Sequence, residues 1–167
     1  FHLAEFVTGL RVTELCADLG SVVAGRELDD DGTALLRFDN GARGVLAASQ
    51  ICTGDENDLR LRVSGDAASL EWRQQEPNSL WIKHAHKPPE LLRSGGPTLG
   101  AAARAHSRLP SGHPEGYLEA FANVYRHFAG QVRAHASGAT THSRVPPMTS
   151  LPTSAKPTRL IRERSRL

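Results

Sequence analysis

The strongest constraint on the fold is a hairpin near the start of the chain. Residues 33–38 run as a strand into Asp39-Asn40-Gly41, and residues 42–51 return. Asparagine and glycine at such a turn accept the positive backbone φ that a tight hairpin connection requires. An acidic run, Asp29-Asp30-Asp31, opens the hairpin as a polar loop. The segment therefore predicts two antiparallel strands, and any fold for the chain must accommodate them.

More strands follow the hairpin at short spacing. Apolar and polar side chains alternate at residues 59–64, 70–73 and 80–83, and a short strand is predicted at 90–93. Such alternation is typical of a strand with one buried and one solvated face. It places Leu59, Leu61 and Val63 toward a helix layer and leaves a charged set opposite: Arg60, Arg62, Glu71 and Arg73. In the hairpin, apolar residues fall on both faces, with Leu35 and Val45 on the outer one.

Two helices are expected to cover the inner face. Residues 1–8 have apolar side chains at helical spacing, and Gly9 stands where helices commonly stop. The second helix is predicted to open with Pro114 at its first position and to end at Gly138. Its apolar stripe is expected to lie on the sheet. The fold class predicted is α+β, a largely antiparallel open sheet with helices on one face.

Charge divides the 167 residues into a body and a tail. Residues 1–138 hold 14 Lys and Arg against 17 Asp and Glu, whereas residues 139–167 hold six basic residues and one acidic residue. The tail is rich in Pro, Ser and Thr and has no sustained period, so we expect a disordered segment. The predicted domains are therefore a structured domain over residues 1–138 and a basic tail over residues 139–167.

Composition also excludes several classes of protein. The body has no basic stripe, so no specific nucleic-acid partner is expected. No apolar run approaches the roughly 20 residues of a membrane helix, so no membrane partner is expected. Cys16 and Cys52 lack the spacing of a disulfide scaffold or metal site. We interpret them as reduced core cysteines of a cytoplasmic protein.

Four runs together resemble one oxidoreductase family. They are Phe1-His2-Leu3-Ala4-Glu5-Phe6-Val7-Thr8-Gly9, the hairpin around Phe38-Asp39-Asn40-Gly41-Ala42-Arg43-Gly44, Leu59-Arg60-Leu61-Arg62-Val63-Ser64-Gly65, and Gly112-His113-Pro114-Glu115-Gly116-Tyr117. In this order they are similar to the C-terminal domain of the Gfo/Idh/MocA (glucose-fructose oxidoreductase, inositol dehydrogenase) family. The resemblance covers about residues 1–136.

The resemblance implies a parent protein of two halves. The family has an N-terminal Rossmann domain that binds NAD or NADP, and a C-terminal domain that shapes a sugar or polyol pocket and forms the oligomer interface. This sequence matches the second half only, without the G-x-G-x-x-G fingerprint or the family's Glu-Lys-Pro and Asp-x-Gly-x-His motifs. We therefore expect a fragment of an NAD(P)-dependent oxidoreductase that binds no cofactor and has no catalytic activity by itself. A stand-alone, noncatalytic module that binds a sugar or a protein partner is the alternative.

Three residues are candidates for the substrate pocket. His113 precedes a helix within a glycine-containing loop, where its ring is available to a substrate hydroxyl, although an N-capping role explains it equally well. Tyr117 follows on the first turn and either lines the same cleft or packs. His2 lies near the expected position of the family's missing histidine. His84 and His86 share a strand face, but no third metal ligand accompanies them, so no metal is expected.

Overall fold

The computed structural model describes residues 1–138, which divide into two compact units, residues 1–54 and residues 55–138. Each unit contains one antiparallel sheet, so the predicted strands belong to two sheets. The predicted tail, residues 139–167, lies outside the described residues. No helix within residues 1–138 is long and apolar enough to span a bilayer.

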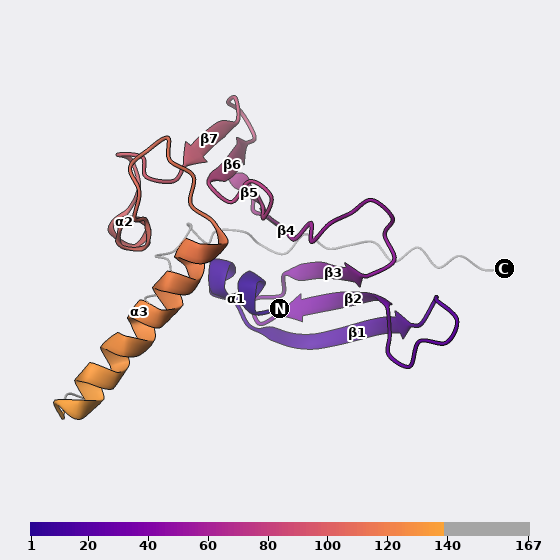
Figure 1. Ribbon diagram of the computed structural model, residues 1–167. Helices are drawn as coiled ribbons and strands as arrows, with labels where there is room; N and C mark the ends of the chain where they lie inside the picture. The colour runs from indigo at the N-terminus through magenta and orange to yellow at the C-terminus, as the bar shows by residue number, and fades with distance from the viewer. Residues whose placement is uncertain (139–167) are drawn as a thin grey trace. The chain divides into compact units, whose positions relative to one another are not determined.

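The first unit is a short helix followed by three strands (Figure 1). Its elements are α1 (His2–Thr8), β1 (Val12–Gly20), β2 (Asp31–Phe38) and β3 (Arg43–Ser49), with sheet order β1-β2-β3. The predicted hairpin is confirmed. Gly41 has φ +85°, and the Phe38 amide donates to the Ala42 carbonyl at 2.9 Å. The Asn40 side chain accepts from the Ala42 amide at 2.9 Å, which fixes the turn.

One face of β2 forms the core of the first unit. Ala34, Leu36 and Phe38 are the buried apolar residues, and five partly buried side chains pack against them: Ala4, Leu10, Val12, Ala42 and Leu46. Ala4 comes from α1, so this helix covers the inner face as predicted. Gly44 lies on the same face, where a Cβ would be 3.1 Å from the Phe38 ring, a tight contact that only a small shift of the ring could relieve.

The opposite face of this sheet is open. Leu35 and Val45 are paired in register across β2 and β3, and they are 59% and 70% exposed. Cys16 pairs with Leu35 from β1 and is also exposed, as is Cys52. The interpretation of the cysteines as core residues is therefore wrong: the bulge between Val12 and Glu14 and the strand alternation that follows it place Cys16 on the outer face.

The second unit contains four strands and two helices. They are β4 (Arg60–Ser64), β5 (Ala68–Arg73), β6 (Ser79–His84), β7 (Glu90–Arg93), α2 (Ala101–His106) and α3 (Tyr117–Ala136). The sheet is antiparallel in the order β4-β5-β6-β7. Its register aligns Leu61, Trp72 and Leu80 across three strands, and Arg62 with Glu71 on the other face, as the alternation predicted. The short helix α2 is not among the elements that the sequence predicted.

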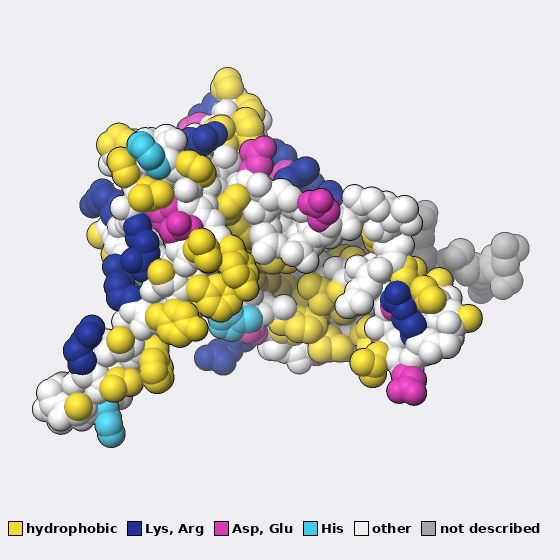
Figure 2. Space-filling view, viewed as in Figure 1, with side chains coloured by type: hydrophobic (Ala, Val, Ile, Leu, Met, Phe, Trp, Pro, Cys, Tyr) yellow, Lys and Arg dark blue, Asp and Glu magenta, His cyan; other side chains and the backbone are white. Residues whose placement is uncertain are grey.

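Two expectations for the long helix α3 are wrong. It begins at Tyr117 rather than at Pro114, because the three residues before Tyr117 belong to a loop that is fixed by other contacts. Its apolar side chains also do not pack on the sheet. Figure 2 shows hydrophobic side chains following α3 toward the lower left, and the exposed residues are Tyr117, Leu118, Phe121, Val124, Tyr125, Phe128 and Val132. Leu118, for example, is 76% exposed.

Polar contacts explain where α3 is held. The Asn123 side chain donates to the His106 carbonyl at 2.9 Å, and the Arg126 guanidinium donates to the Ala105 carbonyl. Arg108 donates to the Asn123 side chain at 2.9 Å. These bonds tie the N-terminal half of α3 to the end of α2 and leave the apolar stripe without a partner in the described part of the second unit.

Candidate functional site

The candidate site is the loop between α2 and α3, residues 107–116, here called the histidine loop. Its tip is a tight turn in which the His113 amide donates to the Pro110 carbonyl at 3.2 Å. Gly112 has φ +89° at the third position of this turn. A type II turn requires positive φ there, and glycine adopts it without steric cost. The turn presents His113 as an exposed side chain.

The carboxylate of Glu115 closes the histidine loop at its neck. Its Oε1 atom accepts hydrogen bonds from the amides of Arg108 and Leu109, both at 2.6 Å. One side chain therefore ties the beginning of the loop to its end. Charge-assisted bonds of this kind are stronger than neutral ones, so the loop has a defined shape although its tip is exposed.

A second carboxylate organises the start of α3. Glu119 accepts a hydrogen bond from the Gly116 amide at 2.8 Å, which satisfies one of the free amides at the helix N-terminus. This amide is the main cause that lowers the pKa of Glu119 below its ordinary value, with a smaller contribution from Arg108. Tyr117 is 72% exposed beside it, and its ring centroid lies 4.7 Å from that of Phe121.

Two of the three predicted site residues lie in the second unit. His113 and Tyr117 are separated by three residues at the junction of the histidine loop and α3. His2 lies on α1, in the first unit, so no described unit contains all three. His84 Nε2 lies 3.2 Å from Glu90 Oε1. Within residues 1–138, no three side chains of metal-ligating type gather in one place.

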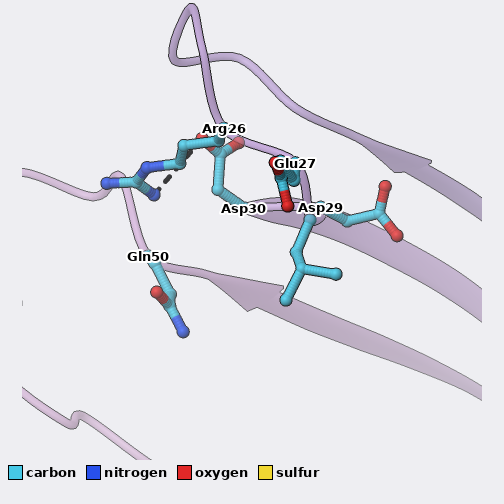
Figure 3. A pocket seen from close by; sticks show the side chains of 6 residues that line it. Arg26, Glu27, Asp29, Asp30 and Gln50 are labelled. Carbon is cyan, nitrogen blue, oxygen red and sulfur yellow. Dashed lines mark ion pairs between the residues drawn. The ribbon is translucent and has the colours of Figure 1, made fainter.

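A separate hollow of about 420 Å³ lies in the first unit, at the loop before β2 (Figure 3). Its lining residues are Arg26, Glu27, Leu28, Asp29, Asp30 and Gln50. Asp30 is buried, but its oxygens accept from the amides of Val22 (2.7 Å) and Val23 (3.1 Å), and Arg26 lies 3.3 Å away.

The bond from the Val22 amide is the main cause that lowers the pKa of Asp30 below 3.8. Burial opposes this shift, while Val23 and Arg26 add to it. The carboxylate is thus engaged by its own loop. It holds Val22, Val23 and Arg26 of that loop.

The described residues do not fit a dinucleotide cofactor. Every strand pair in residues 1–138 is antiparallel, so these residues contain no parallel strand–helix–strand unit. That unit, with a glycine-rich turn at the start of its helix, is what cradles the pyrophosphate of a dinucleotide. Residues 1–138 therefore contain no such cradle for NAD or NADP.

Sequence reasoning missed the residues that hold the histidine loop in place. Glu115 belongs to the run that carries the family resemblance, and Asn78, which bonds to it, belongs to no motif. A pair separated by 37 positions leaves no periodic signal in a single sequence. Asp30 belongs to the acidic run that opens the hairpin, whereas its role depends on the fold of the preceding loop.

Comparison with known proteins identifies the family of the chain. The family model described as the GFO/IDH/MocA C-terminal domain matches residues 1–71. A curated relative, the uncharacterized oxidoreductase YfiI of Bacillus subtilis, is 36% identical over 121 residues, which is 72% of this chain. The chain belongs to the GFO/IDH/MocA family. The resemblance stated from the sequence is thereby confirmed.

Solved structures of this family have the same fold. An oxidoreductase from Sinorhizobium meliloti matches 80% of the chain with 47% identity and a TM-score of 0.76. An inositol dehydrogenase homologue from Azotobacter vinelandii, complexed with NADH and myo-inositol, matches 82% of the chain with 32% identity and a TM-score of 0.78.

The matched region is a minor part of each relative. The chain spans 31% of the Bacillus protein, 39% of the Sinorhizobium chain and 37% of the Azotobacter chain. What those proteins bind is therefore a property of chains more than twice as long as the region that this chain shares with them.

Proposed function

We propose that this chain is the substrate-facing and assembly domain of an NAD(P)-dependent sugar or polyol dehydrogenase. The observation that carries the proposal is the 32% identity, over 82% of the chain, to an inositol dehydrogenase homologue whose structure contains NADH and myo-inositol. The same alignment supports NAD as the cofactor of a full-length parent. The comparisons give no support to a stand-alone, noncatalytic module.

The chemistry of the histidine loop suits a polyol. A neutral imidazole has one donor and one acceptor nitrogen, and a tyrosine hydroxyl both donates and accepts, so each matches the hydroxyl groups of a sugar or polyol. His113 and Tyr117 are exposed on adjacent elements, and Glu115 and Glu119 fix the backbone between them. In this role His113 binds and orients a substrate hydroxyl, while hydride transfer belongs to the nicotinamide held by another part of the parent.

Ligand binding by the full chain tests this role directly. We expect myo-inositol to shift the ring resonances of His113 in NMR, with millimolar affinity because only part of a pocket is present. His113→Ala and Tyr117→Phe should weaken binding by roughly tenfold or less, the range expected for one hydrogen bond. His86→Ala, which removes another exposed histidine of the same unit, is the matched control. Equal binding by the wild type and all three variants would contradict the proposal.

The outer face of the first sheet supports the assembly role. Leu35 and Val45 form an exposed apolar pair in the middle of an otherwise regular sheet, with Arg37 and Arg43 paired beside them. Such a centre with a polar rim is the composition of a homo-oligomer interface. We propose that a second copy covers this face, so that the two sheets meet in a twofold-symmetric pair.

Sedimentation at micromolar concentration tests the assembly role. Leu35→Asp and Val45→Asp should dissociate the pair without disturbing the core, which lies on the opposite face. Leu28→Asp, at an 81% exposed leucine in a loop of the same unit, is the control and should leave the pair intact. A wild-type chain that sediments only as a species of 18.1 kDa would contradict this role.

A further inference from the structure

Asn78 connects the histidine loop to the second sheet. It lies directly before β6, and its side-chain NH₂ group donates to the Glu115 carbonyl at 2.7 Å. The amide of Glu115 donates back to Asn78 Oδ1 at 3.0 Å. Only a side-chain amide offers a donor and an acceptor side by side, so the pair reproduces a backbone ladder between segments 37 positions apart.

The end of β7 orients the Asn78 side chain. Ser94 Oγ donates to Asn78 Oδ1 at 2.7 Å, and the Ser94 amide donates to the Asn78 carbonyl at 3.0 Å. The Glu115 backbone fixes which end of the side-chain amide is the acceptor, because its N–H can only donate and its carbonyl can only accept. The Ser94 hydroxyl then donates to the same oxygen. Asn78 and Ser94 are half-buried, so their bonds are shielded in part from competing water.

Gly95 allows the histidine loop to approach this point. A Cβ at Gly95 would lie 2.8 Å from the Ser111 amide nitrogen and 3.0 Å from the Leu109 carbonyl oxygen. Both atoms are backbone and have little freedom to move. Gly95 also has a backbone φ of +71°, which residues other than glycine rarely adopt. The contact therefore brings the backbone after β7 against residues 109–111, at the start of the turn that carries His113.

We propose that Asn78 and Glu115 are positioning residues for substrate recognition: they hold the histidine loop so that His113 faces the ligand. Asn78 fixes the loop to the sheet, and the Glu115 carboxylate closes its neck on the amides of Arg108 and Leu109. Neither residue needs to touch substrate. This inference rests on the proposed function, since it gives His113 the recognising role.

The test compares isosteric variants of the full chain, with myo-inositol as the probe. Asn78→Asp keeps the shape but has no donor for the Glu115 carbonyl, and its carboxylate repels that oxygen, so the Glu115 segment should open more often. We expect faster hydrogen exchange at the Glu115 amide and about tenfold weaker inositol binding. Amide exchange within β4 and β5 should remain as in the wild type. Asn57→Asp, at an exposed asparagine of the same unit, is the matched control and should change neither quantity.

Glu115 provides the rescue experiment. Glu115→Gln retains an oxygen for the two neck amides and should keep both their protection and the inositol affinity, whereas Glu115→Ala should lose both. Gly95→Ala adds an independent variant, which should loosen the loop without removing any polar group. If Asn78→Asp proves unfolded, the comparison of Glu115→Gln with Glu115→Ala still decides whether the loop is held for substrate binding.

The outcomes separate this inference from the proposed function. If wild-type chain shows no response to inositol, the proposed function fails, and the exchange of the Arg108, Leu109 and Glu115 amides still decides whether the two residues hold the loop. If Asn78→Asp and Glu115→Ala leave both the exchange and the inositol affinity unchanged, the positioning role is wrong. If exchange rises while affinity stays constant, the loop is held but does not position His113, which also overturns the inference.

Discussion

Adjacent leucines on β2 allow a stringent test of where the first unit derives its stability. Leu36 is 5% exposed in the core, whereas Leu35 is 59% exposed on the outer face. Leu36→Ala and Leu35→Ala remove the same three carbon atoms from neighbouring positions of one strand. The intrinsic cost of alanine in a strand is therefore similar in both variants, and their difference reports burial.

The expected magnitudes follow from exposure. Three buried carbons at about 0.8 kcal/mol each give about 2.4 kcal/mol for Leu36→Ala, and the cavity left behind adds to this. A loss of about 3 kcal/mol is a large part of the 5–15 kcal/mol that stabilises a typical domain. Little more than a third of the Leu35 surface is in contact with protein, so Leu35→Ala should lower the free energy of unfolding by about 1 kcal/mol at most.

The assay must report on the first unit alone. Both tryptophans, Trp72 and Trp81, lie in the second unit, so their fluorescence is unsuitable. Hydrogen exchange of β2 amides in increasing urea measures the free energy of opening of the first sheet in each variant. The measurement is repeated at several protein concentrations, since a second copy on the outer face would bury Leu35. Equal losses for the two variants at the lowest concentration would refute the assignment of the core to the Leu36 face.

Three further predictions concern Asp30, Glu119 and NADH binding. Because the pKa of folded Asp30 is below 3.8, its stabilising effect is complete above that pH and is lost as pH falls through the lower folded value, so exchange of the Val22 and Val23 amides should rise only in that acid range. Asp30→Asn should flatten this pH dependence, and an unchanged profile would contradict the assignment. Glu119→Ala should speed exchange of the Gly116 amide about fivefold, whereas Glu119→Gln should restore part of the protection. In a fluorescence titration the chain should show no NADH binding, because residues 1–138 form no dinucleotide fold; micromolar affinity would contradict this.

Local signals predicted the strands well. The Asp39-Asn40-Gly41 turn and the alternation of Leu61 and Val63 depend on backbone φ and on side-chain period, which are properties of neighbouring residues. The family resemblance came from the same local runs. These signals placed His113 on a loop before a helix, where the structure has it.

Contacts between distant segments were not predictable in the same way. The apolar side chains of α3 recur at helical spacing. This spacing predicts an apolar face but does not predict which element packs against it. The hydrogen bonds of Asn123 and Arg126 to the end of α2 hold the helix, and no pattern in the sequence predicts these bonds. The same holds for Asn78 and Glu115, whose pairing depends on where the chain returns after β7.

The exposed stripe of α3 also determines how this helix should melt. A helix with no buried residue gains little from tertiary packing, and an isolated helix of about 20 residues is marginal in water. The bonds of Asn123 and Arg126 support its first half, while Gly130 weakens the second half by about 1 kcal/mol relative to alanine. On heating, the helix should therefore unwind gradually from Ala136 back toward Gly130, before either sheet opens. The far-ultraviolet signal of the chain would then decline in a sloping phase that precedes its cooperative transition, and thermal midpoints taken from helix and from sheet would differ.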